Sequence, residues 1–440
     1  MFESLYTAAE MRAAEEGHDT SELMERAGAA VAREVLQRYP HARRIAVVCG
    51  NGSNGGDGRI AARILREEGC DAVETAAVEQ ADVIVDALFG TGFHGEPRAE
   101  DAATIRRINA AGAPVVSVDV PSGVDASTGE IAGEAVRATL TVAFHGVKVG
   151  LAIAPGLFHT GEVTIAEIGL EPAETALRLV TPAILSVVPR RAPHDNKYTA
   201  GAVLVVGGSA GMTGAVCLAA EAAFRADAGY VTVSVPAASL PVVEVRLLES
   251  VKVTWANALL AAVKAGALAI GPGLGREPEA LRLRDELLAA GVQPVVLDAD
   301  ALHELEPGDW GGRAVLTPHA GELARLLGQE PEWVDAHRLE AAQRAAEHFG
   351  SVCLLKGADT IVAAPGKGAL VCVTDAPGLA TAGTGDVLTG ILAAFLAKGV
   401  EPRLAAAAAA TAHGLAARSR ADQAGMIASD VIAALPSVLS

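Results

Sequence analysis

Aromatic side chains make up only 3% of the 440 residues, although hydrophobic residues make up 51%. The apolar fraction is therefore mostly alanine, valine and leucine, which is typical of helices packed on a parallel sheet. The sequence also lacks an uncharged apolar run of 18 residues, and its alanine run at 405–410 is flanked by Arg403 and His413. This excludes a membrane protein and predicts a buried helix at 405–410.

Cysteines are few and scattered, without any Cys-x-x-Cys pair: Cys49, Cys70, Cys217, Cys353 and Cys372. An odd number without that spacing argues against a disulfide framework and against a zinc site, so we expect core thiols. The N-terminus lacks a basic segment followed by an apolar one and carries Glu3 and Glu10 instead. No secretory signal is visible, and we expect a cytoplasmic protein.

Basic residues are also scarce. The chain has 35 Lys and Arg residues and 53 Asp and Glu residues, which gives a formal charge of −18. Nucleic-acid binding is not expected, because its affinity comes mainly from phosphate neutralisation by Lys and Arg. An anionic ligand would instead need local backbone amides and a few well-placed cations.

The length exceeds what one core supports, so two domains are expected. Both halves alternate near-continuous Val/Ile/Ala strands with helices, which predicts α/β domains with parallel sheets, the first a doubly wound, Rossmann-like sheet. We place the first domain at 1–175 and the second at 196–440. The segment 176–195 has several prolines and no sustained period, and is the expected linker.

Polar groups follow three strands of the first half. They lie in GNGSNGGDG (50–58), at Asp86 in DALFGTGF, and at Asp119 and Ser122 in VDVPSG. Because carboxyl ends of parallel strands meet at one edge, these groups could build a cation site or a site for sugar hydroxyls. The alternative for each Asp is an Asx-turn or a helix cap.

In the second half, TAGTGDVLTG (381–390) places two glycines before a helix, with Asp386 in its first turn. Free amides and a carboxylate base are what in-line phosphoryl transfer needs, although Asp386 could also be an N-cap. Lys356 ends an apolar strand and predicts an anionic partner. Asp298 and Asp300 either cap a helix or steer a metal-bound phosphate.

Three segments in order make 1–170 resemble the NAD(P)H-hydrate epimerase domain: the Gly-Asn-Asp loop, DALFGTG and VDVPSG. The resemblance implies that Asp119 is catalytic, that Lys148 lies near the site, and that Asn54, Asp86 and Ser122 coordinate potassium. Lys148 could equally be a solvated surface lysine. Contacts to the hydrated dinucleotide are implied for Ser53, Asn54, Gly55, Gly56, Asp57, Gly90, Thr91, Gly92, Phe93, His94, Gly95, Glu96 and Asp119.

The first half departs from that pattern in three places, one of which is the stretch FHGVKVG (144–150) in place of the usual Phe-Gly/Ala-x-Lys-x-Gly. Ser53 replaces an asparagine, and 71–81 leaves no room for the strand, helix and linker that the family has there. A non-catalytic dinucleotide-binding module is therefore the alternative for this half.

Five motifs in order make 195–440 resemble the ADP- or ATP-dependent NAD(P)H-hydrate dehydratases, a branch of the ribokinase-like fold: GGSAGMTGA, GPGLG, DADAL, TPHAGE and LLKGADT. The resemblance implies Asp386 as the base, with Ala215, Gly273, His319 and Asp386 contacting the hydrate. It implies nucleotide contacts from Lys356, Gly357, Ala358, Asp359, Thr360 and Gly385. His319 could instead be a satisfied loop histidine, and His413 is expected in the core.

The two resemblances together imply repair of NADH hydrate and NADPH hydrate. One half would epimerise the C6 hydroxyl, and the other would dehydrate the ring with ADP, in preference to ATP, together with Mg²⁺. We also expect a homo-oligomer. A ribokinase-like small-molecule kinase is the remaining alternative, and the absence of a recognisable sugar-binding lid speaks against it.

Overall fold

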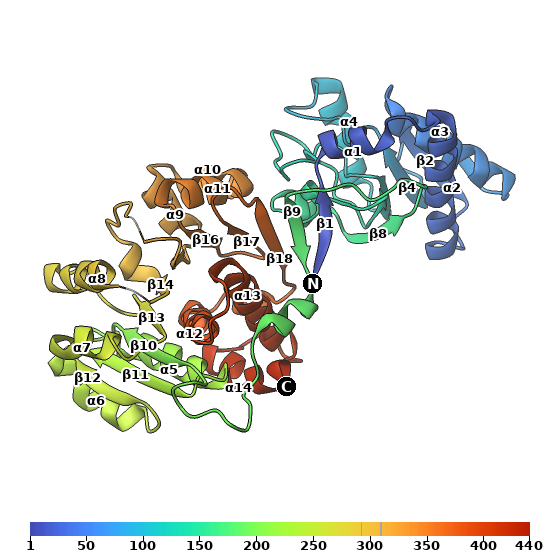
Figure 1. Ribbon diagram of the computed structural model, residues 1–440. Helices are drawn as coiled ribbons and strands as arrows, with labels where there is room; N and C mark the ends of the chain where they lie inside the picture. The colour runs from blue at the N-terminus through green and yellow to red at the C-terminus, as the bar shows by residue number, and fades with distance from the viewer. Residues whose placement is uncertain (292, 309) are drawn as a thin grey trace. The chain divides into compact units, whose positions relative to one another are not determined.

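The computed structural model describes residues 1–291, 293–308 and 310–440. The chain forms two compact units. One holds Ser4–Arg178 with Asp335–His337, and the other holds Met1–Glu3, Leu179–Val334 and Arg338–Ser440. Figure 1 shows strands flanked by helices in each unit, so the expected α/β class is confirmed.

The sheet of the N-terminal unit has the order β3-β2-β4-β5-β6-β8, and all neighbouring strands are parallel. The strands are β2 (Arg44–Cys49), β3 (Asp71–Glu74), β4 (Val83–Ala87), β5 (Val115–Val118), β6 (Leu140–Phe144) and β8 (Glu162–Ala166). From β2 the chain passes to β3 on one side and then to β4 on the other. The connections diverge at the carboxyl ends of β2 and β4, where open parallel sheets bind ligands. This order agrees with the expected Rossmann-like fold.

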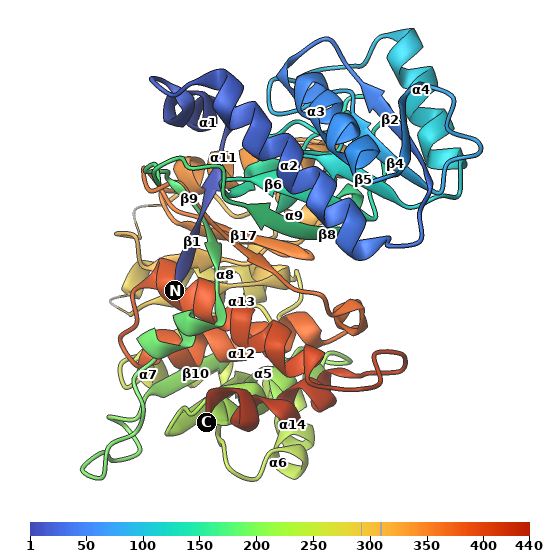
Figure 2. The same cartoon turned by 90° about the vertical axis from the view of Figure 1, so that its right-hand side faces the viewer.

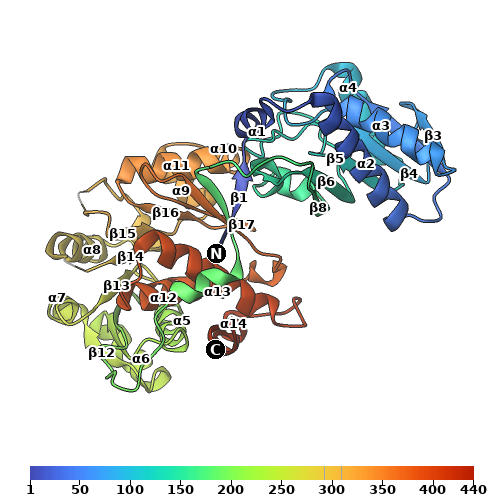
Figure 3. The same cartoon turned by 45° about the vertical axis from the view of Figure 1, so that its right-hand side comes forward.

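Helices cover both faces of this sheet. Ile45 and Val47 of β2 belong to the face covered by α2 (Thr20–Arg38) and α3 (Ser53–Glu67), which lie side by side in Figure 3. Ala46 and Val48 belong to the opposite face, covered by α4 (Ala99–Ala110). Burial on both faces explains why the strands are almost uninterrupted apolar runs.

The expectation that residues 71–81 lack a strand is wrong. Residues Asp71–Glu74 form β3, which pairs in parallel with β2 from Arg44↔Asp71 to Val47↔Glu74. Its four residues need only the edge of β2, so they pair although the connection to β4 is too short for a helix. The sheet therefore keeps its edge strand, and the helix after it is what the shortened segment omits.

The sheet of the C-terminal unit contains the order β12-β11-β10-β13-β14-β15-β16-β17-β18. Its strands are β10 (Ala202–Val206), β11 (Tyr230–Val235), β12 (Val251–Thr254), β13 (Ala267–Ile270), β14 (Val295–Leu297), β15 (Ala314–Leu316), β16 (Val352–Leu355), β17 (Asp359–Ala363) and β18 (Ala369–Val373). Pairing is parallel from β12 to β16 and antiparallel for the last two pairs. The order reverses between β10 and β13, so a second ligand position is expected at their carboxyl ends.

Two helical layers enclose this sheet. One contains α5 (Thr213–Arg225), α12 (Thr384–Ala397), α13 (Pro402–Arg418) and α14 (Ala428–Leu439), and Figure 2 shows α12 beside α13. The other contains α7 (Ala258–Ala262) and α8 (Pro278–Ala290). Alanines 405–410 are buried in α13, as predicted.

The buried helix α12 packs closely against α5. A Cβ built on Gly390 would lie 2.1 Å from the carbonyl oxygen of Ala219, so only glycine permits this approach. Eleven of the fourteen residues of α12 are buried. A helix held on all sides is a rigid support for the side chains at its start.

Residues 176–195, the expected linker, contain β9 (Leu177–Val180) and the short 3-10 helix η3 (Pro182–Val187). Ile184 and Leu185 of η3 belong to the core of the C-terminal unit. All five cysteines are free thiols, and four of them are buried. Within the described residues, no helix is long and apolar enough to cross a membrane.

Candidate active sites

Asp386 lies in the first turn of α12, at a helix start that depends on glycine. Gly383 is the N-cap residue and has a φ of 90°, in the left-handed region. The hydroxyl of Thr384 donates to the carbonyls of Leu379 and Thr381, each at 2.9 Å, which fixes the preceding loop. Asp386 is therefore not the N-cap. The Thr384 amide donates to the Thr381 carbonyl at 3.4 Å, so the first-turn amides that could meet an anion are those of Gly385 and Asp386.

The environment of Asp386 suits a general base. Burial raises the pKa of Asp386 to about 7, with a further contribution from the negative charge of Asp298, while Lys356 lowers it. A base with a pKa near the working pH combines a useful deprotonated fraction with useful basicity.

Lys356 directly follows β16, and its ammonium group reaches the start of α12. A Cβ built on Gly385 would lie 3.6 Å from Nζ of Lys356. Nζ itself is 2.9 Å from Oδ1 of Asp298 and 3.7 Å from Oε2 of Glu322. Burial alone would lower the pKa of Lys356, but these carboxylates outweigh it and raise the pKa, so the group stays charged.

The side chains of Asp298 and Asp300 do not cap the helix, which was one of the two expected alternatives. Asp298 makes no helix-cap bond, and its two oxygens accept from Lys356, Thr317 and Thr389. Asp300 accepts from the amide of Gly275 at 3.0 Å. The first aspartate therefore orients Lys356, and the second holds the glycine loop that follows β13.

The loop after Lys356 exposes its backbone. Gly357 and Ala358 are exposed, and the Thr360 hydroxyl donates to the Gly357 carbonyl at 2.9 Å. The carboxylate of Asp359 is buried instead and accepts from Nε of Arg338 at 2.8 Å. Asp359 therefore shapes the loop from within, which leaves the exposed residues and Lys356 to meet a ligand.

Gly273 and Ala215 are neighbours where the strand order reverses. Gly273 has a φ of 59°, and a Cβ built on it would lie 2.5 Å from the Met212 carbonyl oxygen and 3.3 Å from Cβ of Ala215. A side chain at position 273 would therefore fill the space between the ends of β10 and β13. This is the position expected to receive the hydrate.

His319 is the N-cap of α9 (Ala320–Leu327). Its Nδ1 accepts from the Gly321 amide at 3.0 Å, and Glu322 returns a bond to the His319 amide at 2.9 Å. The ring is 57% exposed, with Nε2 3.5 Å from Glu322. The geometry is compatible with both roles expected for His319, a satisfied loop histidine and a contact to the hydrate, because capping occupies one ring nitrogen and leaves the other accessible.

In the N-terminal unit, Asp86 is fully buried at the end of β4. Its oxygens accept from the hydroxyls of Ser117 at 2.8 Å and Ser122 at 2.6 Å, and from the Ser122 amide at 2.9 Å. Burial raises the pKa of Asp86, and this effect is larger than that of the hydrogen bonds, which lower it. The carboxylate ties the ends of β4 and β5 together.

The two segments expected to contact a dinucleotide meet at Asn54. Its amide nitrogen donates to the Phe89 carbonyl at 2.7 Å, and a Cβ on Gly90 would lie 2.8 Å from its oxygen. Segments 53–57 and 90–96 are therefore adjacent, and most of the second is exposed. Asn54, Asp86 and Ser122 converge because Ser122 donates to both Asp86 and the Phe89 carbonyl.

Asp119 and Lys148 form a buried ion pair. Lys148 donates to Oδ1 of Asp119 and to the Phe144 carbonyl, the latter at 2.6 Å. Lys148 has no exposed surface, so a solvated surface lysine is excluded. Asp119 has a φ of 66°, and such backbone strain in a non-glycine residue is found preferentially at functional sites.

Known proteins match both halves. Residues 203–437 match the family model described as NAD(P)H-hydrate dehydratase, and residues 20–80 and 71–150 match the N-terminus of YjeF-related proteins. A bifunctional NAD(P)H-hydrate repair enzyme of Moorella thermoacetica is 38% identical over 95% of this chain and 92% of its own length. One of Pyrobaculum aerophilum is 40% identical over 95% of this chain and 93% of its length. The chain belongs to this family.

A solved structure supports the fold of the C-terminal unit of this NAD(P)H-hydrate repair enzyme family member. The ADP/ATP-dependent NAD(P)H-hydrate dehydratase of Bacillus subtilis, co-crystallised with ATP and Mg²⁺, is 29% identical with a TM-score of 0.54. The match covers 59% of this chain and 96% of the Bacillus subtilis chain. A ribokinase-like superfamily protein of Enterococcus faecalis has a TM-score of 0.55 at 26% identity, over 61% and 97% of the two chains. The expected ribokinase-like fold is confirmed.

In the candidate site of the N-terminal unit, Glu15 is a neighbour that sequence analysis did not include. Burial, then the negative charges of Asp119 and Glu15, raise the pKa of Asp57 to about 8. Burial and Asp119 also raise the pKa of Glu15, which Lys148 lowers. With its pKa raised to about 8 by burial and by these two neighbouring carboxyl groups, Asp57 keeps its proton at neutral pH. Glu15 lies in α1 (Ala8–Glu15), where nothing in its local pattern indicated a site.

In the candidate site of the C-terminal unit, the neighbours that sequence analysis did not include are Thr389, which donates to Asp298, and Glu322, which lies 3.7 Å from Lys356. Thr389 follows Asp386 by three residues on α12, so both side chains lie on one face of the helix. His413 is buried, and burial lowers its pKa to about 4. It is a neutral core histidine, as expected.

Proposed function

We propose that this chain repairs hydrated NADH and NADPH in two steps. The N-terminal unit inverts the hydroxyl-bearing C6 of the nicotinamide ring, and the C-terminal unit removes the water at the expense of an adenine nucleotide. One observation carries the proposal: Asp386, with a pKa near 7, stands at a glycine-dependent helix start beside the ammonium of Lys356.

The dehydration follows from that arrangement. Asp386 takes the proton of the C6 hydroxyl, and the oxygen attacks the terminal phosphorus of the nucleotide, whose bridging oxygen leaves with the shortened nucleotide. The C6–O bond then breaks, with the ring nitrogen lone pair moving toward C6, and inorganic phosphate leaves. Loss of a proton from C5 restores the double bond of NAD(P)H. Lys356 and the first-turn amides of α12 stabilise the phosphoryl charge.

The phosphoryl donor we propose is ADP, with ATP as the other candidate. The exposed backbone of Gly357 and Ala358, together with Lys356 and Gly385, supports a nucleotide site at this loop. Among the described residues, no group of three His, Cys, Asp or Glu side chains could hold a metal ion by itself. Mg²⁺ would therefore be shared with the nucleotide phosphates, where it supplies neutralising charge.

For the N-terminal unit we propose that Asp119 is the group that acts on the C6 centre, and that potassium is held by Asn54, Asp86 and Ser122. The donor set fits potassium, because all three residues offer oxygen and Asp86 is a fully buried carboxylate bonded to neutral donors. Potassium would supply the countercharge and keep the ends of β4 and β5 in place. The buried Asp119–Lys148 pair supports the catalytic assignment.

The experiment follows the absorbance of the reduced ring after purified protein meets NADH hydrate with ADP or with ATP. Recovery of NADH with release of inorganic phosphate is expected. Accumulation of a stable phosphorylated substrate would instead favour the kinase alternative. No turnover of either hydrate with either nucleotide would overturn the proposal.

We further propose a cytoplasmic homo-oligomer. Exposed apolar side chains on α6 (Leu240–Arg246), on α7, between the two helices and directly after α7 support an oligomer, and each is more than half exposed: Val242, Val245, Leu248, Leu260 and Val263. These segments lie beside β12, the edge strand of the sheet. An apolar group of this kind next to an open edge commonly marks a protein interface.

A further inference from the structure

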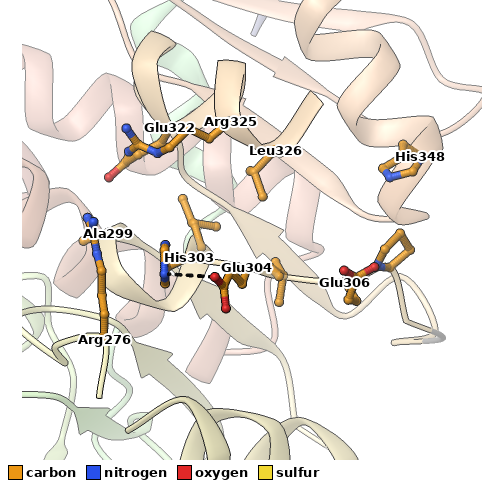
Figure 4. Close-up of a pocket in the computed structure, with 12 residues that line it drawn as sticks. Arg276, Ala299, His303, Glu304, Glu306, Glu322, Arg325, Leu326 and His348 are labelled. Atoms are coloured by element: carbon orange, nitrogen blue, oxygen red, sulfur yellow. Dashed lines mark ion pairs between the residues drawn. The ribbon is translucent and has the colours of Figure 1, made fainter. Parts of the chain in front are cut away.

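The side chain of His145 is buried without a hydrogen-bond partner. The residue is 8% exposed, and neither of its ring nitrogens has a partner in the protein. Two other histidines do have polar neighbours. Nε2 of His303 lies 3.6 Å from Glu304, as Figure 4 shows, and Nδ1 of His159 lies 3.0 Å from the Val136 carbonyl. Within the described residues, no other histidine has both ring nitrogens buried and unpartnered. A buried polar group of this kind calls for an explanation.

The backbone at His145 is strained as well. Its φ of 64° lies in the left-handed region, which glycine adopts freely and a residue with a Cβ does not. The His145 amide donates to the Ala166 carbonyl at the end of β8, at 2.9 Å, so the neighbouring strand holds this backbone in place. Asp119, at the end of β5, has a similar φ of 66°. Strain of this kind persists where the surrounding structure holds a functional geometry.

His145 belongs to the turn 144–148, which holds the carboxylate of Asp119. The Phe144 amide donates to Oδ1 of Asp119 at 3.1 Å, and Lys148 donates to the same oxygen. Lys148 also donates to the Phe144 carbonyl at 2.6 Å, and the Gly146 amide donates to that carbonyl at 2.7 Å. The turn is therefore closed on itself, and it presents one amide and one ammonium group to one carboxylate oxygen.

The His145 ring packs this turn against Tyr6. The two rings are stacked, with their centroids 5.2 Å apart and an interplanar angle of 28°. Tyr6 belongs to β1 (Phe2–Tyr6), which pairs in parallel with β7 (Val147–Lys148) and places Tyr6 opposite Lys148. A Cβ built on Gly146 would lie 2.6 Å from Cε2 of Tyr6, so the phenol ring lies directly on the turn. The stacked pair therefore supports the turn on the side of its ammonium group.

We propose that His145 is a positioning residue for epimerisation by the N-terminal unit. Its uncharged ring, held against Tyr6, fixes the turn 144–148 and with it the amide and the ammonium group that hold Asp119. His145 acts through Asp119 and Lys148 and not on the substrate. The inference rests on the proposed epimerisation and on the role proposed there for Asp119. It concerns a residue of FHGVKVG, a stretch in which this chain departs from the family pattern.

Burial also makes this positioning sensitive to acid. Burial lowers the pKa of His145, and Lys148 of β7 lowers it further, whereas Glu167 and Glu171 of the segment after β8 raise it. From β1, Tyr6 faces the ring with its phenol. An imidazolium without a partner is unfavourable in the core, so the protonated ring should leave its place. Because an ordinary histidine has a pKa near 6.5, a lowered pKa puts the loss of positioning below about pH 6.5.

The test measures interconversion of the two hydrate epimers by the full-length protein. It starts from one epimer without nucleotide, so that dehydration does not interfere. The variants are His145→Gly, which removes the ring and suits the positive φ, and His145→Phe, which keeps a stacking ring that cannot be protonated. The matched control is His41→Phe, on the exposed surface of the same unit. Dehydration of the directly usable epimer with ADP is the internal reference for each protein.

At pH 8, His145→Gly should epimerise about ten- to a hundredfold more slowly, in kcat and not in KM, because a slightly misplaced catalytic group costs rate on this scale. His145→Phe and His41→Phe should stay within about threefold of wild type, and dehydration should be unchanged in all variants. Between pH 7 and pH 5, wild type should lose up to about tenfold relative to His145→Phe.

Hydrogen exchange gives a readout that does not depend on activity. The amides at positions 144, 145 and 146 all have partners within the protein, so their exchange reports on the turn. Exchange at these positions should be faster in His145→Gly and unchanged in His145→Phe.

Three results would overturn the inference. Epimerisation by His145→Gly with the kcat of wild type would show that the ring does not position the turn. An equal loss in His145→Phe and His145→Gly would show that the ring nitrogens matter and the stacking does not. Overlaid pH profiles of wild type and His145→Phe would show that protonation of His145 does not release the turn.

Failure of the wild type to interconvert the epimers is a different result, because it rejects the proposed epimerisation itself. Hydrogen exchange still tests the positioning in that case. Unchanged exchange at positions 144–146 in His145→Gly would then overturn the inference by itself.

Discussion

Nζ of Lys356 lies 2.9 Å from Oδ1 of Asp298, and this ion pair joins the ends of β14 and β16 across the intervening strand β15. Thr317, which follows β15, donates to the same oxygen of Asp298 at 2.8 Å. Three strand ends therefore hold one ammonium group at the start of α12. This geometry underlies the first prediction.

Lys356→Met should raise the KM for the nucleotide more than the KM for the hydrate, because the ammonium neutralises phosphate and not the ring. It should also lower stability, since a buried charge that loses its partner costs about 3–5 kcal/mol. The double variant Lys356→Met/Asp298→Asn separates the effect on stability from the effect on nucleotide binding. Its stability should return toward that of wild type, whereas its nucleotide affinity should stay low. Overlaid nucleotide titrations of wild type and Lys356→Met would show that the nucleotide site is misplaced.

Asp386→Asn should reduce dehydration by about 10²–10⁴, the contribution of a positioned base. Nucleotide binding should remain, because the amide keeps the shape of the side chain and the helix start. Turnover and nucleotide affinity are measured on the same preparation. Turnover within about threefold of wild type would remove Asp386 from the proposed role.

The pH dependence of turnover should follow Asp386. Its pKa is raised to about 7, and the base must be deprotonated, so turnover should fall about tenfold for each pH unit below 7. A profile that is flat between pH 5 and 8 would contradict this assignment.

Stability should show the opposite pH trend at the same residue. Folded Asp386 binds its proton more tightly than the unfolded chain does, so its contribution to stability is present below about pH 4 and is lost as the pH rises through about 7. Asp386→Asn should therefore be more stable than wild type at pH 8 and not at pH 4. Thermal unfolding at the two pH values measures the difference.

Asp119→Asn should stop epimerisation and leave dehydration of the directly usable epimer unchanged. With a mixture of both epimers and excess nucleotide, wild type should consume both, and the variant should leave one behind. Asparagine is chosen because it can still accept from the Phe144 amide, which lies 3.1 Å from Oδ1 of Asp119. If wild type also stops halfway, the N-terminal unit is a binding module. Equal rates and complete conversion in both proteins would make Asp119 structural.

Val245→Glu should reduce the oligomer mass measured by light scattering, because Val245 is 83% exposed on α6 within the apolar group. Burying a charge at an interface is costly, whereas the same change on a free surface is nearly neutral. An unchanged mass would show that this face is not the interface.

The sequence by itself determined that the chain forms two α/β units and in which order the strand-end motifs occur. A strand buried on both faces must be continuously apolar, and a loop that presents amides to an anion must contain glycine, so both features are written locally. Gly383 and Asp386 could be placed at a helix start for this reason. The family resemblance followed from the same local motifs.

Only the tertiary structure decided which distant groups meet and how much water they lose. Whether Lys148 faces solvent or Asp119 depends on burial within the folded unit, and Glu15 joins Asp57 through packing that no local pattern encodes. The strand at 71–74 forms because the edge of β2 is open to it, which its own four residues do not reveal. The raised pKa values of Asp57 and Asp386 exist only in the fold, because desolvation and neighbouring charges from other elements produce them.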